Sequence, residues 1–161
     1  MFHMKPDVKR WFGLLTLGLT FTIPMSRLSA QLATEKGTAA LKVQVTGARN
    51  AKGTIRAALF RGEKGFPSDA SQAVRTQAAE IDGKTMTAQF VFADLPEGVY
   101  AVSVFHDENS NQKFDKNLMG IPKEGYGASN NPKKRMGPPG FEEAKFALSG
   151  TGQSLEIKLI Y

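Results

Sequence analysis

The sequence predicts an all-β domain: a seven-stranded β-sandwich of the immunoglobulin-like or transthyretin-like type, with one long Gly/Pro-rich loop. Three observations support this fold class. Short segments alternate apolar and polar residues, as strands with one buried face do; polar turns separate these segments; and no segment repeats its apolar residues with the period of a helix. The antibody type of domain is excluded, because the chain has no cysteine and therefore no Cys–Trp–Cys pattern.

Residues 1–30 have the layout of a secretory signal. Three basic residues precede an uncharged apolar run, Trp11–Ile23, and small residues follow it up to Ala30. The run is shorter than the roughly 20 residues that a membrane-spanning helix needs, although an uncleaved N-terminal anchor is the alternative. We therefore expect a signal peptide over residues 1–30, a short flexible lead over residues 31–39 and a single β-sandwich domain over residues 40–161.

The charge balance changes once the predicted signal is removed. The whole chain has a net charge of +6, from 21 Lys and Arg against 15 Asp and Glu. Residues 31–161 keep 17 basic and 14 acidic residues, which is a net charge of +3. This balance is ordinary, so no nucleic-acid partner is expected. The mature form is expected to be exported, either periplasmic or secreted, and not to associate with membranes.

Seven segments have the patterns of strands. The most apolar of them, Val99–Phe105, is apolar on both faces and is therefore predicted to lie at the centre of a sheet. Asp82 and Gly83 predict a tight hairpin turn between the third and fourth strands. A long irregular segment rich in Gly, Pro, Asn and Lys follows the fifth strand, from residue 107 to about residue 140. The predicted strands cover residues 39–46, 54–60, 74–81, 85–92, 99–105, 143–148 and 155–161.

The start of this irregular segment has the spacing of a calcium-binding loop. Asp107, Asn109, Asn111 and Asp115 fall at relative positions 1, 3, 5 and 9. In an EF-hand loop, oxygen ligands occupy positions 1, 3 and 5, a backbone carbonyl occupies position 7, and a water-linked group often occupies position 9. Lys113 would supply the carbonyl at position 7. These five residues are the predicted metal site, and calcium is the only predicted cofactor.

Two positions depart from the EF-hand pattern. Position 6, which is Gly in EF-hand loops because the chain turns sharply there, is Gln112. Position 12, which is a bidentate Glu in those loops, is Leu118. The alternative hypothesis is that the Asp and Asn side chains bond to their own backbone and form turns without an ion.

The rest of the irregular segment is a candidate partner-binding loop. A loop this long in a compact domain is either functional or disordered. Tyr126 and Phe141 are the candidate aromatic anchors, and Lys133, Lys134 and Arg135 form a basic run within the loop. The partner would be an envelope protein or a surface ligand. The alternative is a packed loop that covers a sheet edge, where Pro and Lys discourage strand pairing.

The sequence holds no complete catalytic set, so an exported binding or structural module is expected rather than an enzyme. His106 is the only histidine after residue 30, and no nucleophile–base–orienter arrangement is recognisable. Two alternatives stay open. One is an envelope enzyme that acts on a glycan or another small substrate with His106 and Asp107. The other is a small outer-membrane β-barrel, because residues 155–161 alternate and end on an aromatic residue.

Several motifs spread over residues 41–161 match one known family. They are Gly53-Thr54-Ile55 with Arg61 and Gly65-Phe66-Pro67, Leu95–Val102, Phe105–Asn109, Gly120–Gly127, and Pro138-Pro139 with Phe141. On these motifs, the chain resembles the uncharacterised secreted bacterial domain-of-unknown-function family 2141. The resemblance implies an exported sandwich domain and implies no activity. One departure is Gln112, because the family tends to have Gly at that position.

Overall fold

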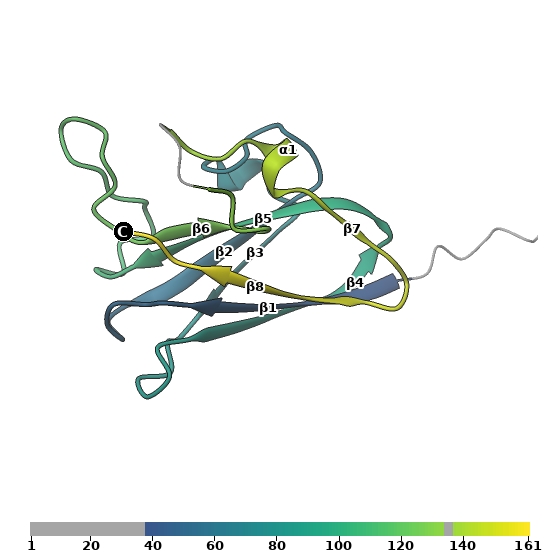
Figure 1. The fold of residues 1–161 in the computed structure, drawn as a ribbon, viewed down its shortest axis with the longest axis horizontal. Helices are drawn as coiled ribbons and strands as arrows, with labels where there is room; N and C mark the ends of the chain where they lie inside the picture. Colours follow the sequence, from purple (N-terminus) through teal and green to yellow (C-terminus); the bar gives the residue numbers. More distant parts are fainter. Residues whose placement is uncertain (1–37, 134–136) are drawn as a thin grey trace, which may run out of the picture. The chain divides into compact units, whose positions relative to one another are not determined.

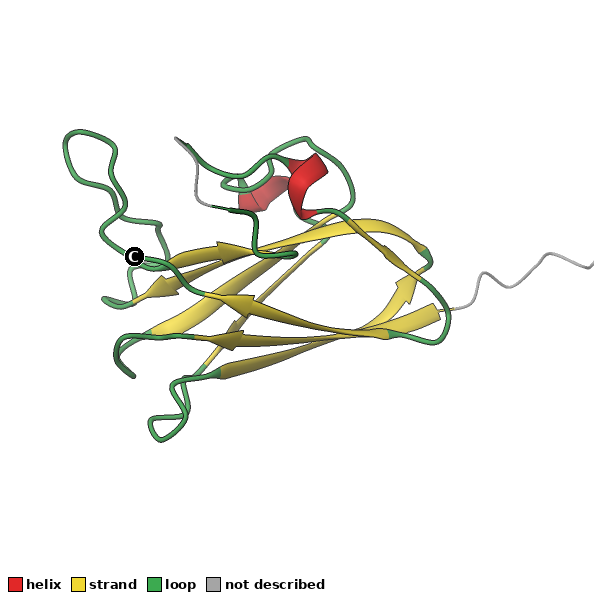
Figure 2. Cartoon of the chain, in the orientation of Figure 1, coloured by secondary structure: helices red, strands yellow, loops and turns green. Residues whose placement is uncertain are grey.

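The computed structural model describes residues 38–133 and 137–161, whose arrangement is shown in Figures 1 and 2. These residues form an all-β fold with eight strands in two sheets and two short helical turns. The predicted signal, residues 1–30, lies outside the described residues, as does the predicted lead up to residue 37. The first strand begins at Thr38, two residues before the predicted start of the domain.

The first sheet has three strands in the order β4–β1–β8, namely β4 (Ala88–Pro96), β1 (Thr38–Thr46) and β8 (Gln153–Lys158). The central strand, β1, pairs antiparallel with β4 and parallel with β8. Alternate residues of β1 are buried, among them Leu41 and Val43, because successive side chains of a strand point to opposite faces.

The second sheet is built around β5 (Gly98–Asp107). One edge of β5 pairs with β2, which pairs in turn with β3. The other edge pairs with two short strands, β7 at the start of β5 and β6 further along. The predicted central position of the most apolar strand is therefore confirmed. The other strands of this sheet are β2 (Thr54–Phe60), β3 (Arg75–Ala79), β6 (Tyr126–Ala128) and β7 (Phe146–Leu148).

Two hydrophobic cores explain why both faces of β5 are apolar. The main core lies between the two sheets and includes Tyr100, Val102 and Val104 of β5. A second core covers the opposite face at Ala101, where the short helix α1 (Phe141–Ala144) packs. Fully burying one large apolar side chain stabilises a fold by about 1.5–3 kcal/mol. The strand that leads to the polar site is therefore held from both sides.

Tyr100 fixes the corner between β4 and β5. Its side chain is 1% exposed, and its hydroxyl donates a hydrogen bond to the Pro96 carbonyl at 2.7 Å. The Arg61 guanidinium lies 5.8 Å from the centroid of the Tyr100 ring. Because β4 and β5 belong to different sheets, the Tyr100 hydrogen bond ties the two sheets together at this corner.

Three sequence-based predictions about strands are wrong, and the first two concern the number of strands and a hairpin. The described chain has eight strands and not seven, because β6 lies inside the segment predicted to be irregular; its three residues are too few to show an alternating pattern. The tight hairpin predicted at Asp82 and Gly83 does not pair β3 with β4, because these strands lie in different sheets; the turn there spans residues 82–87, and an antiparallel bridge joins Asp82 to Thr87. The Asp82 carboxylate instead accepts hydrogen bonds from the backbone N–H groups of Lys84 and Thr85, which closes a longer turn.

One helical turn, α1, replaces the start of the strand predicted over residues 143–148. The Gly140 N–H donates to the Glu143 carboxylate at 3.1 Å, which caps this turn, so the strand begins only at Phe146. The other helical segment is the 3-10 turn Ala70–Gln72. Within the two described ranges, no helix has the length and apolar character that crossing a bilayer requires.

Candidate functional site

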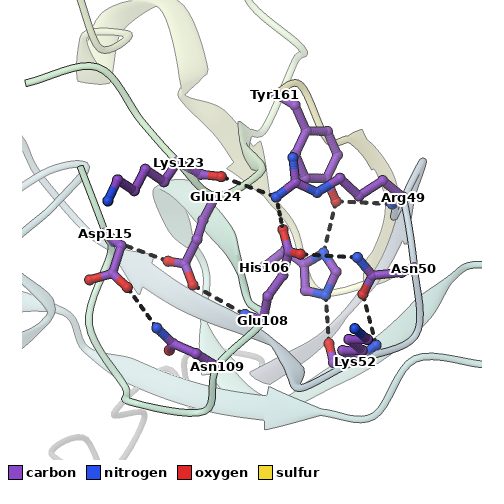
Figure 3. A network of polar contacts seen from close by, with 10 residues as sticks. All are labelled: Arg49, Asn50, Lys52, His106, Glu108, Asn109, Asp115, Lys123, Glu124 and Tyr161. Carbon is purple, nitrogen blue, oxygen red and sulfur yellow. Dashed lines mark hydrogen bonds and ion pairs between the residues drawn. The ribbon is translucent and has the colours of Figure 1, made fainter. Parts of the chain in front are cut away.

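Three of the five buried polar or charged residues of the described chain lie at or near the end of β5: His106, Asp107 and Glu124. From there, residues 108–125, the β5–β6 connection, lead back to β6. The turn between β1 and β2 and the C-terminal Tyr161 meet the same place (Figure 3). We name the side chains in Figure 3 the β5-end network. Its members are Arg49, Asn50, Lys52, His106, Glu108, Asn109, Asp115, Lys123, Glu124 and Tyr161.

His106 is fully buried, and both of its ring nitrogens are engaged. Nε2 lies 2.7 Å from the Lys52 carbonyl oxygen, and Nδ1 lies 2.8 Å from the Tyr161 hydroxyl. A carbonyl can only accept, so Nε2 carries a proton; in the neutral ring the Tyr161 hydroxyl then donates to Nδ1. Burial raises the pKa of Tyr161, which keeps that hydroxyl protonated. His106 thus joins the β1–β2 turn to the C-terminus.

Arg49 connects the β1–β2 turn to two other segments, the β5–β6 connection and the C-terminus. Its Nη2 forms an ion pair with Glu108 Oε1 at 2.6 Å and donates to the Lys123 carbonyl at 3.2 Å. Its backbone N–H donates to the Tyr161 hydroxyl at 3.0 Å, and its guanidinium lies 4.5 Å from the centroid of the Tyr161 ring. Burial alone would raise the pKa of Glu108, but a hydrogen bond from Asn50 and the Arg49 guanidinium outweigh burial and hold this pKa below its usual value.

Glu124 closes the first part of the β5–β6 connection into a loop. The residue is only 4% exposed. Oε1 accepts a hydrogen bond from the Glu108 N–H at 3.1 Å, and Oε2 accepts one from the Asp115 N–H at 3.0 Å. Hydrogen bonds from N–H groups offset the free-energy cost of burying a carboxylate. The buried Glu124 carboxylate therefore holds residues 108 and 115 on either side of it.

The predicted calcium loop is the segment that Glu124 closes. Its first residue, Asp107, is fully buried, and its two carboxylate oxygens accept hydrogen bonds from the N–H groups of Asn111 at 3.0 Å and Gln112 at 2.9 Å. The side-chain amides of Asn109 and Asn111 both donate to Asp115 Oδ2, at 2.8 and 3.0 Å. Three of the five predicted ligands thus converge at one point, with Asp107 buried and bonded to the loop backbone.

The side-chain oxygens of this loop also bond to its backbone. The Asn109 oxygen accepts from the Asn111 N–H at 3.1 Å, and the Asn111 oxygen accepts from the Lys113 N–H at 2.7 Å. Gln112 has a φ of 65°, the left-handed conformation that Gly adopts most readily. In residues 38–133 and 137–161, no three or more His, Cys, Asp or Glu side chains gather as a metal site would require. Calcium binding stays a prediction.

The far end of the β5–β6 connection is apolar and exposed. We name residues 118–121 the tip. Leu118, Met119 and Ile121 have relative exposures of 107%, 80% and 54%. Figure 1 shows the green loop that contains them projecting away from the sheets. Local sequence patterns do not predict this exposed cluster, because the exposure of its side chains depends on the shape of the loop.

A cavity of about 240 Å³ lies beside β6. It is smaller than the roughly 300–1,000 Å³ of sites that enclose whole small molecules, so its size fits a side chain of a partner better. Tyr126 and Lys133, two of the predicted partner-contacting residues, line the cavity. Its other lining residues are Gly127, Ala128, Asn131, Pro132, Gly137, Pro138, Pro139, Glu143, Lys158 and Ile160.

The remaining predicted partner-contacting residues do not join this cavity. Phe141, predicted as a candidate anchor, is 9% exposed, and its ring packs edge-to-face against Phe66 with centroids 5.8 Å apart. The structure therefore gives Phe141 a packing role in the second core. Lys134 and Arg135 lie outside the described residues.

Sequence reasoning missed Arg49, Asn50 and Glu124 as members of one network. Arg49 and Asn50 lie in a polar turn, where residues of these types are common, so their spacing carries no signal. Glu124 lies in one of the long motifs, between Lys123 and Gly125, but a motif does not show which of its side chains is buried.

Two glycines in the motifs have a steric role at this site. Gly53 has a φ of 65°, and a Cβ there would lie 1.8 Å from the Asp107 carbonyl oxygen. A Cβ at Gly125 would lie 2.5 Å from Cζ of Tyr161. Both distances are too short for any side chain, so these glycines allow the β1–β2 turn and the C-terminus to approach the end of β5.

Fold and site together define a class of protein: an all-β domain of two sheets in which a buried polar network supports an exposed loop. A family model described as an uncharacterized protein conserved in bacteria (DUF2141) matches residues 43–156. This match covers most of the chain, so the chain belongs to this family, and the resemblance carried by the motifs is confirmed. None of the curated proteins compared with the chain matches it.

The lowered pKa of Glu108 predicts how the stability of the site depends on pH. A carboxylate whose pKa is lower in the folded state stabilises that state above the ordinary glutamate pKa of about 4.3, and this contribution is lost as the pH falls through the folded-state pKa. We expect Glu108→Gln to lower the free energy of unfolding by about 0.5–1 kcal/mol at neutral pH, because solvent screens the half-exposed Arg49. The difference from wild type should shrink towards zero in acid.

Urea unfolding of both proteins at neutral and at acidic pH measures this difference. Glu63→Gln is the matched control, because Glu63 is exposed, and it should leave stability unchanged at both pH values. A Glu108→Gln effect of the same size at both pH values would contradict the role assigned to the ion pair.

Proposed function

We propose that this protein is an exported binding module whose contact surface is the β5–β6 connection together with the cavity beside β6. One contrast supports the proposal most directly: buried hydrogen bonds fix the base of the connection, while its tip exposes three large apolar side chains. Loops held by a rigid scaffold are the usual location of binding residues. An exposed apolar cluster on such a loop is a typical mark of a contact surface.

We further propose the immunoglobulin-like or transthyretin-like type of β-sandwich for the domain. Tyr100 supports this type, because immunoglobulin-like domains have a buried tyrosine at a strand corner whose hydroxyl bonds to the backbone a few residues upstream. The signal-like pattern of residues 1–30 supports export to the periplasm or to the exterior.

The burial of His106 and Asp107 favours binding over catalysis at the end of β5. Neither residue has exposed surface, and both ring nitrogens of His106 and both carboxylate oxygens of Asp107 are engaged within the protein. A general base must reach the proton that it removes, within about 2.6–3.2 Å or through one water. The alternative of a glycan-acting enzyme therefore requires the end of β5 to open.

Site-specific photo-crosslinking in the bacterial host tests the proposed contact surface. A photoreactive amino acid replaces one residue at a time: Leu118 on the tip, Lys133 at the cavity, or Val91 on the exposed face of β4 as the matched control. We expect light-dependent adducts at Leu118 and Lys133 and none at Val91, because only the first two positions would face a ligand. Adducts at Val91 alone, or at none of the three positions, would contradict the proposal.

We also propose that calcium orders the start of the β5–β6 connection. The convergence of side chains on Asp115 and the left-handed turn at Gln112 support this proposal. Few carboxylates contribute, and the Asn amides must turn their oxygens towards the ion, so we expect a dissociation constant of about 10⁻⁴–10⁻³ M. The ligands would be Asp107, Asn109, Asn111, Asp115 and the carbonyl of Lys113.

Thermal melting with calcium and with a chelator tests this ion site. At about 5 mM calcium, we expect the melting temperature to rise by about 4 °C, because an ion that binds only the folded state stabilises it. Asp115→Asn should abolish this rise, and Asp94→Asn, a change at an exposed position on β4, should keep it. An unchanged melting temperature of the wild type in calcium and in chelator would refute the site.

A further inference from the structure

The three most exposed large apolar side chains of the described chain lie within four consecutive residues. Leu118, Met119 and Ile121 belong to one narrow turn, and Lys116 and Pro122 form a bridge across its base. Single exposed apolar residues are normal on a protein surface, but a cluster marks a contact site. The other exposed large apolar side chains have relative exposures of 39–53% and come from different parts of the chain: Val74, Val91, Val99 and Tyr161.

Asn117 satisfies the hydrogen bonds of the tip from within the loop. Its side-chain oxygen accepts from the N–H groups of Met119 and Ile121, both at 2.9 Å. Its carbonyl accepts from the Gly120 N–H at 2.9 Å, and its own N–H donates to the Ile121 carbonyl at 2.8 Å. An N–H group that leaves water for a lipid environment must be bonded within the protein, since lipid tails offer no acceptor. Three N–H groups of the tip, those of Met119, Gly120 and Ile121, and the N–H of Asn117 beside it meet this condition.

The charges around the tip are basic. Lys113, Lys116 and Lys123 flank it and are exposed, and no acidic residue lies between Lys116 and Lys123. The neighbouring acids, Asp115 and Glu124, accept hydrogen bonds from within the connection. Lysine can lay its apolar stem along an apolar surface and keep its ammonium group at the level of lipid headgroups. Basic residues near an anionic bilayer are attracted to it.

We propose that the tip inserts into the interfacial region of a bilayer that contains anionic lipids, with the flanking lysines at the level of the headgroups. The inference rests on the proposed function in one respect, because it takes the β5–β6 connection as the contact surface. It reverses the sequence-based expectation that the mature form does not associate with membranes.

The composition around the tip favours lipid over a protein partner. A stable protein–protein interface buries more than about 1,000 Å² and has an apolar centre, and lysine is depleted from such interfaces. The tip offers three apolar side chains, with Lys116 and Lys123 beside them. Shallow insertion into an anionic bilayer, by contrast, needs only a few apolar side chains with basic side chains beside them.

Vesicle flotation of the processed protein tests the proposal. Its probes are vesicles of phosphatidylcholine alone and vesicles of equal parts phosphatidylcholine and phosphatidylglycerol. We expect binding to the anionic vesicles only. The triple variant Leu118→Ser, Met119→Ser, Ile121→Ser should bind at least about tenfold more weakly, because its apolar contacts are lost. Lys116→Gln and Lys123→Gln should each weaken binding about fivefold. The backbone bonds of Asn117 remain in all these variants.

A double variant, Val74→Ser with Val91→Ser, is the matched control, because it removes exposed apolar area elsewhere. It should bind as the wild type does. Insertion depth has a direct readout, since Trp11 is the only tryptophan of the chain and lies in the predicted signal. A tryptophan introduced by Leu118→Trp should shift its emission to the blue on anionic vesicles, whereas one introduced by Val91→Trp should not.

Two results overturn the inference: no binding of the wild type to anionic vesicles, or equal binding by the wild type and the triple serine variant. Photo-crosslinking separates this failure from failure of the proposed function. A protein adduct at Leu118 without tip-dependent vesicle binding would keep the contact surface and reject lipid as its ligand. A lack of both protein and lipid adducts at Leu118 and Lys133 would reject the contact surface itself.

Discussion

Glu124 lies almost entirely out of water, and a carboxylate in such a place is stable only when hydrogen-bond donors meet it. Its two donors are the backbone N–H groups of Glu108 and Asp115, so the same two bonds also fix the shape of the chain between those residues. His106 and Arg49 add the β1–β2 turn and the C-terminus to this arrangement. Segments far apart in the sequence thus form one support for the β5–β6 connection.

This support explains how one connection can be polar and buried at its base and apolar and exposed at its end. Without fixed hydrogen bonds, a loop that carries Leu118, Met119 and Ile121 would lower its free energy by folding these side chains onto the protein. Glu124 holds the base, and Asn117 holds the turn, so the apolar side chains stay in solvent. The polar residues give the loop its shape, and the exposed residues are then available for contact.

Much of the fold could be predicted from the sequence, because alternation reports directly which face of a strand is buried. The apolar β5 and the all-β class followed from that pattern, whereas β6 did not, since three residues show no period. The predicted hairpin at Asp82 failed because turn chemistry is local and does not say whether the next strand stays in the same sheet. At the site, the pattern located the Asp107 loop but not Arg49 or Glu124. Their roles come from contacts between residues far apart in sequence, which no local spacing encodes.

Hydrogen exchange at the backbone amides of Glu108 and Asp115 tests most directly whether a buried carboxylate supports the connection. In the wild type, both amides should exchange slowly, because they donate to Glu124. In Glu124→Gln, one acceptor oxygen is replaced by a donor group, so exchange at one or both amides should be at least about tenfold faster while the amides of β1 and β2 stay protected. Fast exchange of both amides in the wild type, or protection unchanged in the variant, would contradict the role of the Glu124 carboxylate in holding the β5–β6 connection.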